Sequence, residues 1–232
     1  EYFRELGYEI AAIGKVAHYA TVRSYGFDHF SQFNYHEDDC IDAATKWVTE
    51  RKSTKPLCLI VGTNWPHVPW PKDAGDGGSL PLAPRLVDTP ETRAAWAAYG
   101  AAVSNADRDL GIIYDTTRRV LGDDTLFVFT SDHGSQFPFG KWNCYDAGLR
   151  TPLVAVWPGK ITPNAKSEAL VSWIDLLPTF IEAAGGKPPE SGLKPGQSRV
   201  LITSTSKNAG ETLTCVTVCG PDAGARRRVA CR

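Results

Sequence analysis

The chain has 232 residues, of which 42% are hydrophobic and 22% are charged, and its formal net charge is −1. This composition is typical of a folded globular protein, and the near-zero charge excludes a general electrostatic attraction to nucleic acid or to an anionic membrane. The length suits one sizeable α/β domain or two small ones, and no apolar run approaches the roughly 20 residues needed to span a bilayer.

The chain opens on residues that resemble the end of a helix, without a signal peptide. It contains no methionine, and we expect it to have been cut from a longer protein. Residues 9–13 predict a short strand that runs into a turn at Gly14, where no side chain obstructs the backbone. Lys15 and His18 follow this strand, and taken alone both fit a solvent-exposed surface more readily than a site. Residues 19–37 show no clear period and are interpreted as a loop.

A helix is predicted to begin at Asp38 or Asp39 and to continue to about Lys52, because apolar residues recur on one face. Residues 57–62 then form a continuous apolar run of strand length. The stretch that follows contains three prolines, which forbid a helix and hold the backbone extended. His67 lies in this stretch, just beyond the strand. The alternative interpretation is a loop histidine packed between two tryptophans.

The middle of the chain predicts a surface loop followed by a long helix. Residues 72–90 are rich in glycine and proline and are interpreted as the loop. The helix starts at Thr89 and Pro90, shows apolar residues at steps of mostly three and four, and ends at Leu121 before Gly122.

The apolar run Leu126–Phe129 predicts a buried strand, and residues 153–157 predict another. Asp132 and His133 lie where the first of these strands ends, and Lys141 follows within one short loop. Open α/β sheets bind their ligands at the carboxyl ends of strands, so this stretch is the main candidate for a site. An isolated Asp-His pair is more often a structural turn, and the rest of the chain has to decide between the two interpretations.

The last part of the chain differs in composition. Residues 169–172 predict a further strand, and Asp175 predicts the cap of the helix that follows. The 7 tryptophans, 8 tyrosines and 9 phenylalanines all lie at or before Phe180. A stretch without aromatic residues cannot pack like the preceding domain. We therefore predict one domain over residues 1–198 and an atypical tail over residues 199–232, either disordered or translated in a shifted reading frame.

Charged and imidazole side chains collect at the predicted strand ends. Lysines act as point charges on anionic oxygens, histidines can hydrogen-bond these oxygens or transfer a proton, and an aspartate in a turn can hold a hard cation. This combination favours a small, highly charged oxyanion as the ligand. The residues are Lys15, His18, His67, Asp132, His133 and Lys141.

Five ordered landmarks resemble those of the sulfatases, which belong to the alkaline phosphatase-like superfamily, with bacterial arylsulfatases and heparan N-sulfatase-like enzymes as the most similar subgroup. The resemblance covers roughly residues 1–198 and implies an α/β core, a mostly parallel mixed sheet flanked by helices, that is truncated at its N-terminus. The landmarks are Gly14-Lys15-Val16-Ala17-His18, Trp65-Pro66-His67-Val68-Pro69, Thr130-Ser131-Asp132-His133-Gly134, Phe139-Gly140-Lys141 with Arg150-Thr151-Pro152, and Asp175-Leu176-Leu177-Pro178-Thr179.

The resemblance implies a calcium-dependent hydrolase that cleaves a sulfate ester or sulfamate of a small substrate, an aryl sulfate or a sulfated sugar. Asp132 and His133 match the calcium ligands. Lys15, His67 and Lys141 match groups that bind the sulfate oxygens, and these three with His18 match catalytic groups. His67 or Lys141 is expected to protonate the leaving oxygen, and His18 to act on the hydroxyl of the nucleophile. The resemblance also favours a periplasmic or secreted location for a longer parent protein.

The chain departs from the family pattern in three ways. The family nucleophile is a formylglycine made in a Cys/Ser-x-Pro/Ala-x-Arg motif. None of the six cysteines begins that motif or belongs to a paired Cys-x-x-Cys set typical of zinc sites, so we expect the nucleophile and the remaining calcium ligands upstream. Two residues separate Lys15 from His18 where one is commoner, and His133 stands where many relatives have asparagine.

Two alternatives remain open. The first is a phosphodiesterase or phosphonate hydrolase of the same superfamily. The second is an inactive fragment that binds sulfated glycans weakly through its lysines and through Trp65, Trp70 and Trp142.

Overall fold

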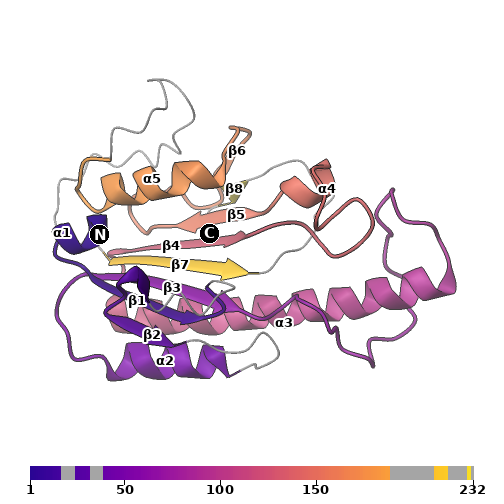
Figure 1. Ribbon diagram of the computed structural model, residues 1–232, viewed down its shortest axis with the longest axis horizontal. Coiled ribbons are helices and arrows are strands. Elements are labelled where there is room, and N and C mark those ends of the chain that lie inside the picture. The colour runs from indigo at the N-terminus through magenta and orange to yellow at the C-terminus, as the bar shows by residue number, and fades with distance from the viewer. Residues whose placement is uncertain (17–23, 32–38, 189–211, 219–228, 231–232) are drawn as a thin grey trace.

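The fold is organised around one mixed β-sheet, whose strands lie side by side in the computed structural model shown in Figure 1. The structure describes residues 1–16, 24–31, 39–188, 212–218 and 229–230, the last two ranges as backbone only. Across the sheet the strands follow the order β2-β1-β3-β7-β4-β5-β8-β6. Their bounds are β1 Glu9–Gly14, β2 His29–Ser31, β3 Leu57–Thr63, β4 Thr125–Ser131, β5 Leu153–Val156, β6 Lys166–Ser167, β7 Thr212–Val218 and β8 Val229–Ala230.

Most of the described sheet is parallel. β1 pairs in parallel with β2 and β3, and β7 pairs in parallel with both β3 and β4. β5 runs antiparallel to β4, β8 runs parallel to β5, and β6 runs antiparallel to β8. The carboxyl ends of β1, β3 and β4 therefore meet at one edge of the sheet, where an α/β fold places its ligands.

Helices cover both faces of this sheet (Figure 1): α2 and α3 lie on one side, and α1 and α5 lie on the other. Side chains alternate between the two cores along each central strand, so that Leu57 and Leu59 of β3 pack toward α2 while Cys58 packs on the opposite face. The α/β class and the mostly parallel mixed sheet expected from the sequence are confirmed. The helices are α1 Tyr2–Glu5, α2 Cys40–Glu50, α3 Pro90–Leu121, α4 Asp146–Leu149, the 3₁₀ turn η2 Trp173–Asp175, and α5 Leu176–Ala183.

The long helix α3 begins and ends where its sequence predicts. The hydroxyl of Thr89 accepts a hydrogen bond from the Thr92 N–H at 3.2 Å, and Pro90 is the first helical residue. After Leu121 the backbone leaves the helix at Gly122, whose φ is 81°.

Two local predictions need correction. Residues 169–172 are not a strand; the strand in this region is β6, and Ser172 instead begins a capping box in which its N–H donates to the Asp175 carboxylate at 2.7 Å. Asp175 is the N-cap residue of α5, as the sequence predicts, but its side chain bonds to Ser172 of the η2 capping box and not to α5. Within residues 19–37, β2 is a strand rather than a loop. It has only three half-buried residues, too few to show a strand period.

The tail contributes strands to the sheet. β7 lies between β3 and β4, and β8 lies between β5 and β6, although the composition of this region predicts disorder or a shifted reading frame. The backbones at 212–218 and 229–230 are therefore extended and paired. The division of the chain at residue 199 stays a prediction.

Candidate functional site

Three of the predicted site residues follow three parallel strands at the same edge of the sheet. Lys15 follows β1 directly, and its N–H donates to the Gly62 carbonyl of β3 at 2.9 Å. This close approach requires Gly14, which has φ of 86° and whose added Cβ would lie 2.1 Å from the Gly62 carbonyl oxygen. His67 lies in the turn after β3, where its N–H donates to the Asn64 carbonyl at 2.9 Å. The turn after β4 carries Asp132.

The central contact of the site joins Lys141 to His67. The Lys141 Nζ lies 3.3 Å from the His67 Nε2. The other ring nitrogen, Nδ1, lies 2.6 Å from the Val68 carbonyl oxygen. A carbonyl only accepts, so Nδ1 carries the hydrogen and the lone pair of Nε2 faces the ammonium group. The neutral imidazole thus accepts a hydrogen bond from Lys141.

Burial is the main cause that lowers the pKa of His67 below its ordinary value. The hydrogen bond to Val68 raises this pKa, the positive charges of Lys15 and Lys141 lower it, and the negative charge of Asp132 raises it. These three charged groups therefore all act on one ring. Two cations beside a neutral imidazole make a place where an anion is electrostatically favoured.

The loop that carries Lys141 is held in place by its own backbone and by Arg85. The N–H of Lys141 donates to the Ser135 carbonyl at 2.8 Å. The Arg85 Nε donates to the Pro138 carbonyl at 3.1 Å, and its Nη2 lies 3.3 Å from the Ser135 hydroxyl. Phe137 of the same loop stacks on Trp70, with ring centroids 5.0 Å apart. Trp70 follows the turn that carries His67, so this stack links that turn to the loop that carries Lys141.

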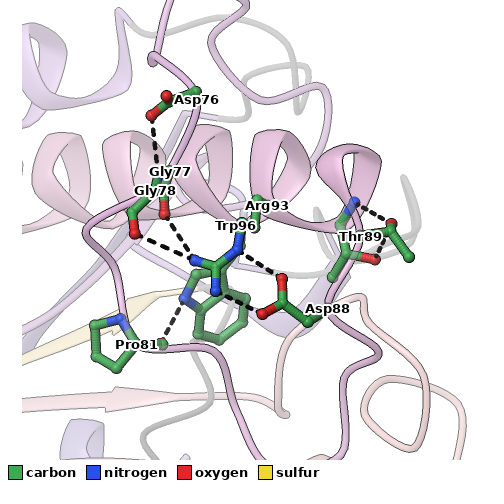
Figure 2. Close-up of polar contacts among 9 residues, drawn as sticks. Asp76, Gly77, Gly78, Pro81, Asp88, Thr89, Arg93 and Trp96 are labelled. Atoms are coloured by element: carbon green, nitrogen blue, oxygen red, sulfur yellow. Dashed lines mark hydrogen bonds and ion pairs between the residues drawn. The ribbon is translucent and has the colours of Figure 1, made fainter.

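The segment that carries Arg85 is anchored to the first turns of α3, as Figure 2 shows. Arg93 of α3 makes a two-pronged ion pair with Asp88, with its Nε 2.6 Å from one carboxylate oxygen and its Nη2 2.7 Å from the other. The same guanidinium donates to the carbonyls of Gly77 and Gly78 at 3.4 and 3.3 Å, and the Trp96 indole N–H donates to the Pro81 carbonyl at 3.1 Å. The predicted surface loop is therefore an ordered support for the Lys141 loop.

Asp132 and His133 lie together after β4. One oxygen of Asp132 accepts the His133 N–H at 2.9 Å, and the other lies 3.4 Å from His133 Nε2. The Nδ1 of His133 lies 2.7 Å from the Gly134 carbonyl oxygen. Calcium takes about six to eight oxygen ligands, and within the described ranges no group of three or more His, Cys, Asp or Glu could hold a metal. Asp132 supplies one suitable oxygen ligand, His133 supplies a softer nitrogen, and both stay predicted ligands.

The structure therefore brings the charged groups of Lys15, Lys141 and Asp132 together around the imidazole ring of His67. His18 lies outside the described residues. The sequence analysis did not identify Arg85, because a single arginine in a loop rich in proline and glycine has no local pattern that distinguishes it.

The chain is similar to known proteins of one family. The family model described as Sulfatase matches residues 1–186. An ulvan-active sulfatase from Formosa agariphila is 31% identical over 202 residues, which are 82% of this chain and 39% of that protein. Human arylsulfatase G is 30% identical over 173 residues, 64% of this chain and 30% of that protein. Human N-acetylgalactosamine-6-sulfatase is 31% identical over 142 residues, 52% of this chain and 27% of that protein.

The chain thus spans about two fifths or less of the length of these relatives. Across the described residues, no helix has both the length and the apolar character needed to cross a membrane.

Proposed function

The chain belongs to the sulfatase family, and from this premise we propose that it forms the sulfate-binding and proton-transferring part of a sulfuric ester hydrolase. Sulfatases generally depend on formylglycine and calcium. The proposed substrate is a small sulfate ester or sulfamate. Relatives include an enzyme named for N-acetylgalactosamine, an amino sugar, and others named as arylsulfatases.

The observation that carries the proposal is the contact between Lys141 and His67, with the charge of Lys15 acting on the same imidazole. A sulfate group needs donors on several oxygens, and ammonium groups make the stronger, charge-assisted hydrogen bonds with anions. Lys15, His67 and Lys141 come from three different loops at one sheet edge, so they can contact different oxygens of the same tetrahedral group. Substrate binding is therefore assigned to these three residues.

Cleavage of the ester leaves an alkoxide oxygen that must gain a proton. In the free protein the hydrogen between the two groups belongs to Lys141, because His67 Nε2 is the acceptor. We assign the leaving-group proton to this pair, with Lys141 as its carrier and His67 as the group that orients the ammonium. The family nucleophile, when present, supplies the atom that attacks sulfur. His18 stays a proposed partner of that nucleophile.

The test is titration of the chain with sodium sulfate by isothermal titration calorimetry at low ionic strength, where screening is weakest. Hydrogen bonds to charged groups contribute about 1.5–3 kcal/mol each, so Lys141→Ala and Lys15→Ala should each weaken sulfate binding by about tenfold or more. The matched control is Lys166→Ala, because Lys166 is an exposed lysine of β6, the last strand in the sheet order. It should leave the affinity unchanged.

Two outcomes would contradict the proposal. One is sulfate binding that responds equally to all three lysine substitutions, which would indicate a non-specific charge effect. The other is inorganic phosphate binding with much higher affinity than sulfate, which would favour the phosphodiesterase or phosphonate hydrolase alternative.

A further inference from the structure

Three aromatic side chains stand exposed on the loop that carries Lys141. Phe139, Trp142 and Tyr145 are 49%, 80% and 58% exposed, and we call them the aromatic platform. None of them belongs to either core cluster. Phe139 and Tyr145 meet edge to face, with centroids 5.2 Å apart. Exposed aromatic rings gathered on one short loop call for an explanation other than packing of the fold.

The backbone presents these rings in an unusual way. Phe139 has φ of 63° and Trp142 has φ of 68°, the left-handed region that bulky residues rarely adopt. Between them lie Gly140, which is buried, and Lys141. Bulky residues persist in such conformations only when the surroundings determine them, and these positions cluster at ligand sites.

The surroundings here hold the loop through several hydrogen bonds. Gly140 donates to the Phe137 carbonyl at 2.9 Å, Asn143 donates to the Gly140 carbonyl at 3.2 Å, and the Asn143 side chain donates to the Lys141 carbonyl at 3.3 Å. One hydrogen-bonded loop thus carries both the platform and Lys141.

The platform lies directly beside the proposed anion site. The Trp142 ring centroid is 5.2 Å from the Lys141 Nζ, and the same Nζ is 3.3 Å from His67 Nε2. The Trp142 ring is therefore within reach of a ligand whose anionic group contacts Lys141.

We propose that the aromatic platform is the subsite for the sugar ring of a sulfated carbohydrate, a substrate assignment that rests on the proposed function. A pyranose has one face rich in C–H groups, which packs on an aromatic ring, while its hydroxyls stay in water. Open, solvent-exposed rings suit such a two-sided ligand. A wholly apolar aryl group would gain more from a closed hydrophobic pocket.

The experiment compares four probes on the 232-residue chain by calorimetry: inorganic sulfate, N-acetylgalactosamine 6-sulfate, unsulfated N-acetylgalactosamine and 4-nitrophenyl sulfate. Trp142→Ala should weaken binding of the sugar sulfate about fivefold to tenfold and leave inorganic sulfate unchanged, because stacking on one ring contributes at this level. Trp142→Phe should restore most of the loss. Tyr25→Ala, which removes an aromatic ring 64% exposed elsewhere, is the matched control and should change neither affinity.

The outcomes separate the subsite from the proposed function. If Lys141→Ala abolishes sulfate binding but Trp142→Ala leaves the sugar sulfate unaffected, the subsite is refuted and the anion site stands. A larger loss for 4-nitrophenyl sulfate than for the sugar sulfate overturns the carbohydrate assignment. If neither inorganic sulfate nor the sugar sulfate binds, both proposals fail. Thermal unfolding of Trp142→Ala should match the parent, and a lowered midpoint together with equal losses for both anions would also overturn the subsite.

Discussion

Sulfate binding by this chain should strengthen as the pH falls, and His67 should be the cause. In the free protein, burial and the charges of Lys15 and Lys141 lower the pKa of His67, so its ring is neutral near neutral pH. A bound sulfate dianion would offset those two positive charges and raise the pKa of the ring. Binding is then coupled to uptake of a proton. The affinity should rise as the pH falls through the pKa of the bound state and level off below the lower pKa of the free state.

The size of the effect follows from Coulomb's law. Unit charges about 4 Å apart interact by about 1 kcal/mol in water and by about 4 kcal/mol near a protein surface of low effective dielectric. His67 is half-buried, and sulfate carries two charges, so we take the lower part of this range and expect at least about 1.4 kcal/mol. That value corresponds to about a tenfold gain in affinity.

The assay is calorimetric titration with sodium sulfate at constant ionic strength from about pH 8 to about pH 5, the range in which histidine changes charge. His67→Gln removes the titrating ring and should flatten the profile. His29→Gln is the matched control, because burial also lowers the pKa of His29, which lies in β2 and stacks on Trp47 with ring centroids 4.7 Å apart. A flat profile for the parent chain, or an unchanged slope in His67→Gln, would refute the reasoning.

Three further substitutions test the supports of the site and the sheet. Gly140→Ala places a Cβ 2.1 Å from the Ser135 carbonyl oxygen, and the shift it forces should cost about 1–3 kcal/mol in urea unfolding and weaken sulfate binding severalfold by displacing the loop. Asp28→Asn weakens the bond from the Ile10 N–H (2.8 Å), the main cause of the lowered pKa of Asp28. The charged Asp28 carboxylate stabilises the fold at pH values above its ordinary pKa, and this stabilisation is lost as the pH falls through its lowered pKa in the folded state. The free energy of unfolding of the variant should therefore drop by less than about 1 kcal/mol at pH 7 and by less again in acid. Val216→Pro removes a ladder hydrogen bond from β7 between its two neighbours. A carbonyl left without its donor should cost about 1–3 kcal/mol.

Each of these has an outcome that would count against it. Unchanged sulfate affinity in Gly140→Ala would show that the loop does not position Lys141. A loss in Asp28→Asn that is as large in acid as at neutral pH would mean that its charge contributes nothing. Neutral behaviour of Val216→Pro in urea would support the sequence-based expectation that the tail is foreign to the fold.

The sequence alone was enough to predict much of the scaffold, because local physics decides these features. Apolar runs of strand length predict β1, β3, β4 and β5, and the Thr89-Pro90 start predicts α3. It also placed Lys15, His67 and Asp132 correctly at strand ends. Parallel strands end at one edge of a sheet, so residues that follow them converge without any knowledge of the detailed packing.

Local residue patterns therefore predict which elements form and which polar residues follow them. The tertiary structure alone decided that Lys141 meets His67, 74 residues away in the chain, and that the Val68 carbonyl sets the tautomer of that ring. Tertiary structure was also needed to show that Arg85 bonds to the Lys141 loop and that β7 lies in the sheet. Side-chain patterns report burial within a single element, whereas these contacts join distant segments. The pairing of β7 depends on backbone N–H and C=O groups that every residue type carries except proline, which lacks the N–H.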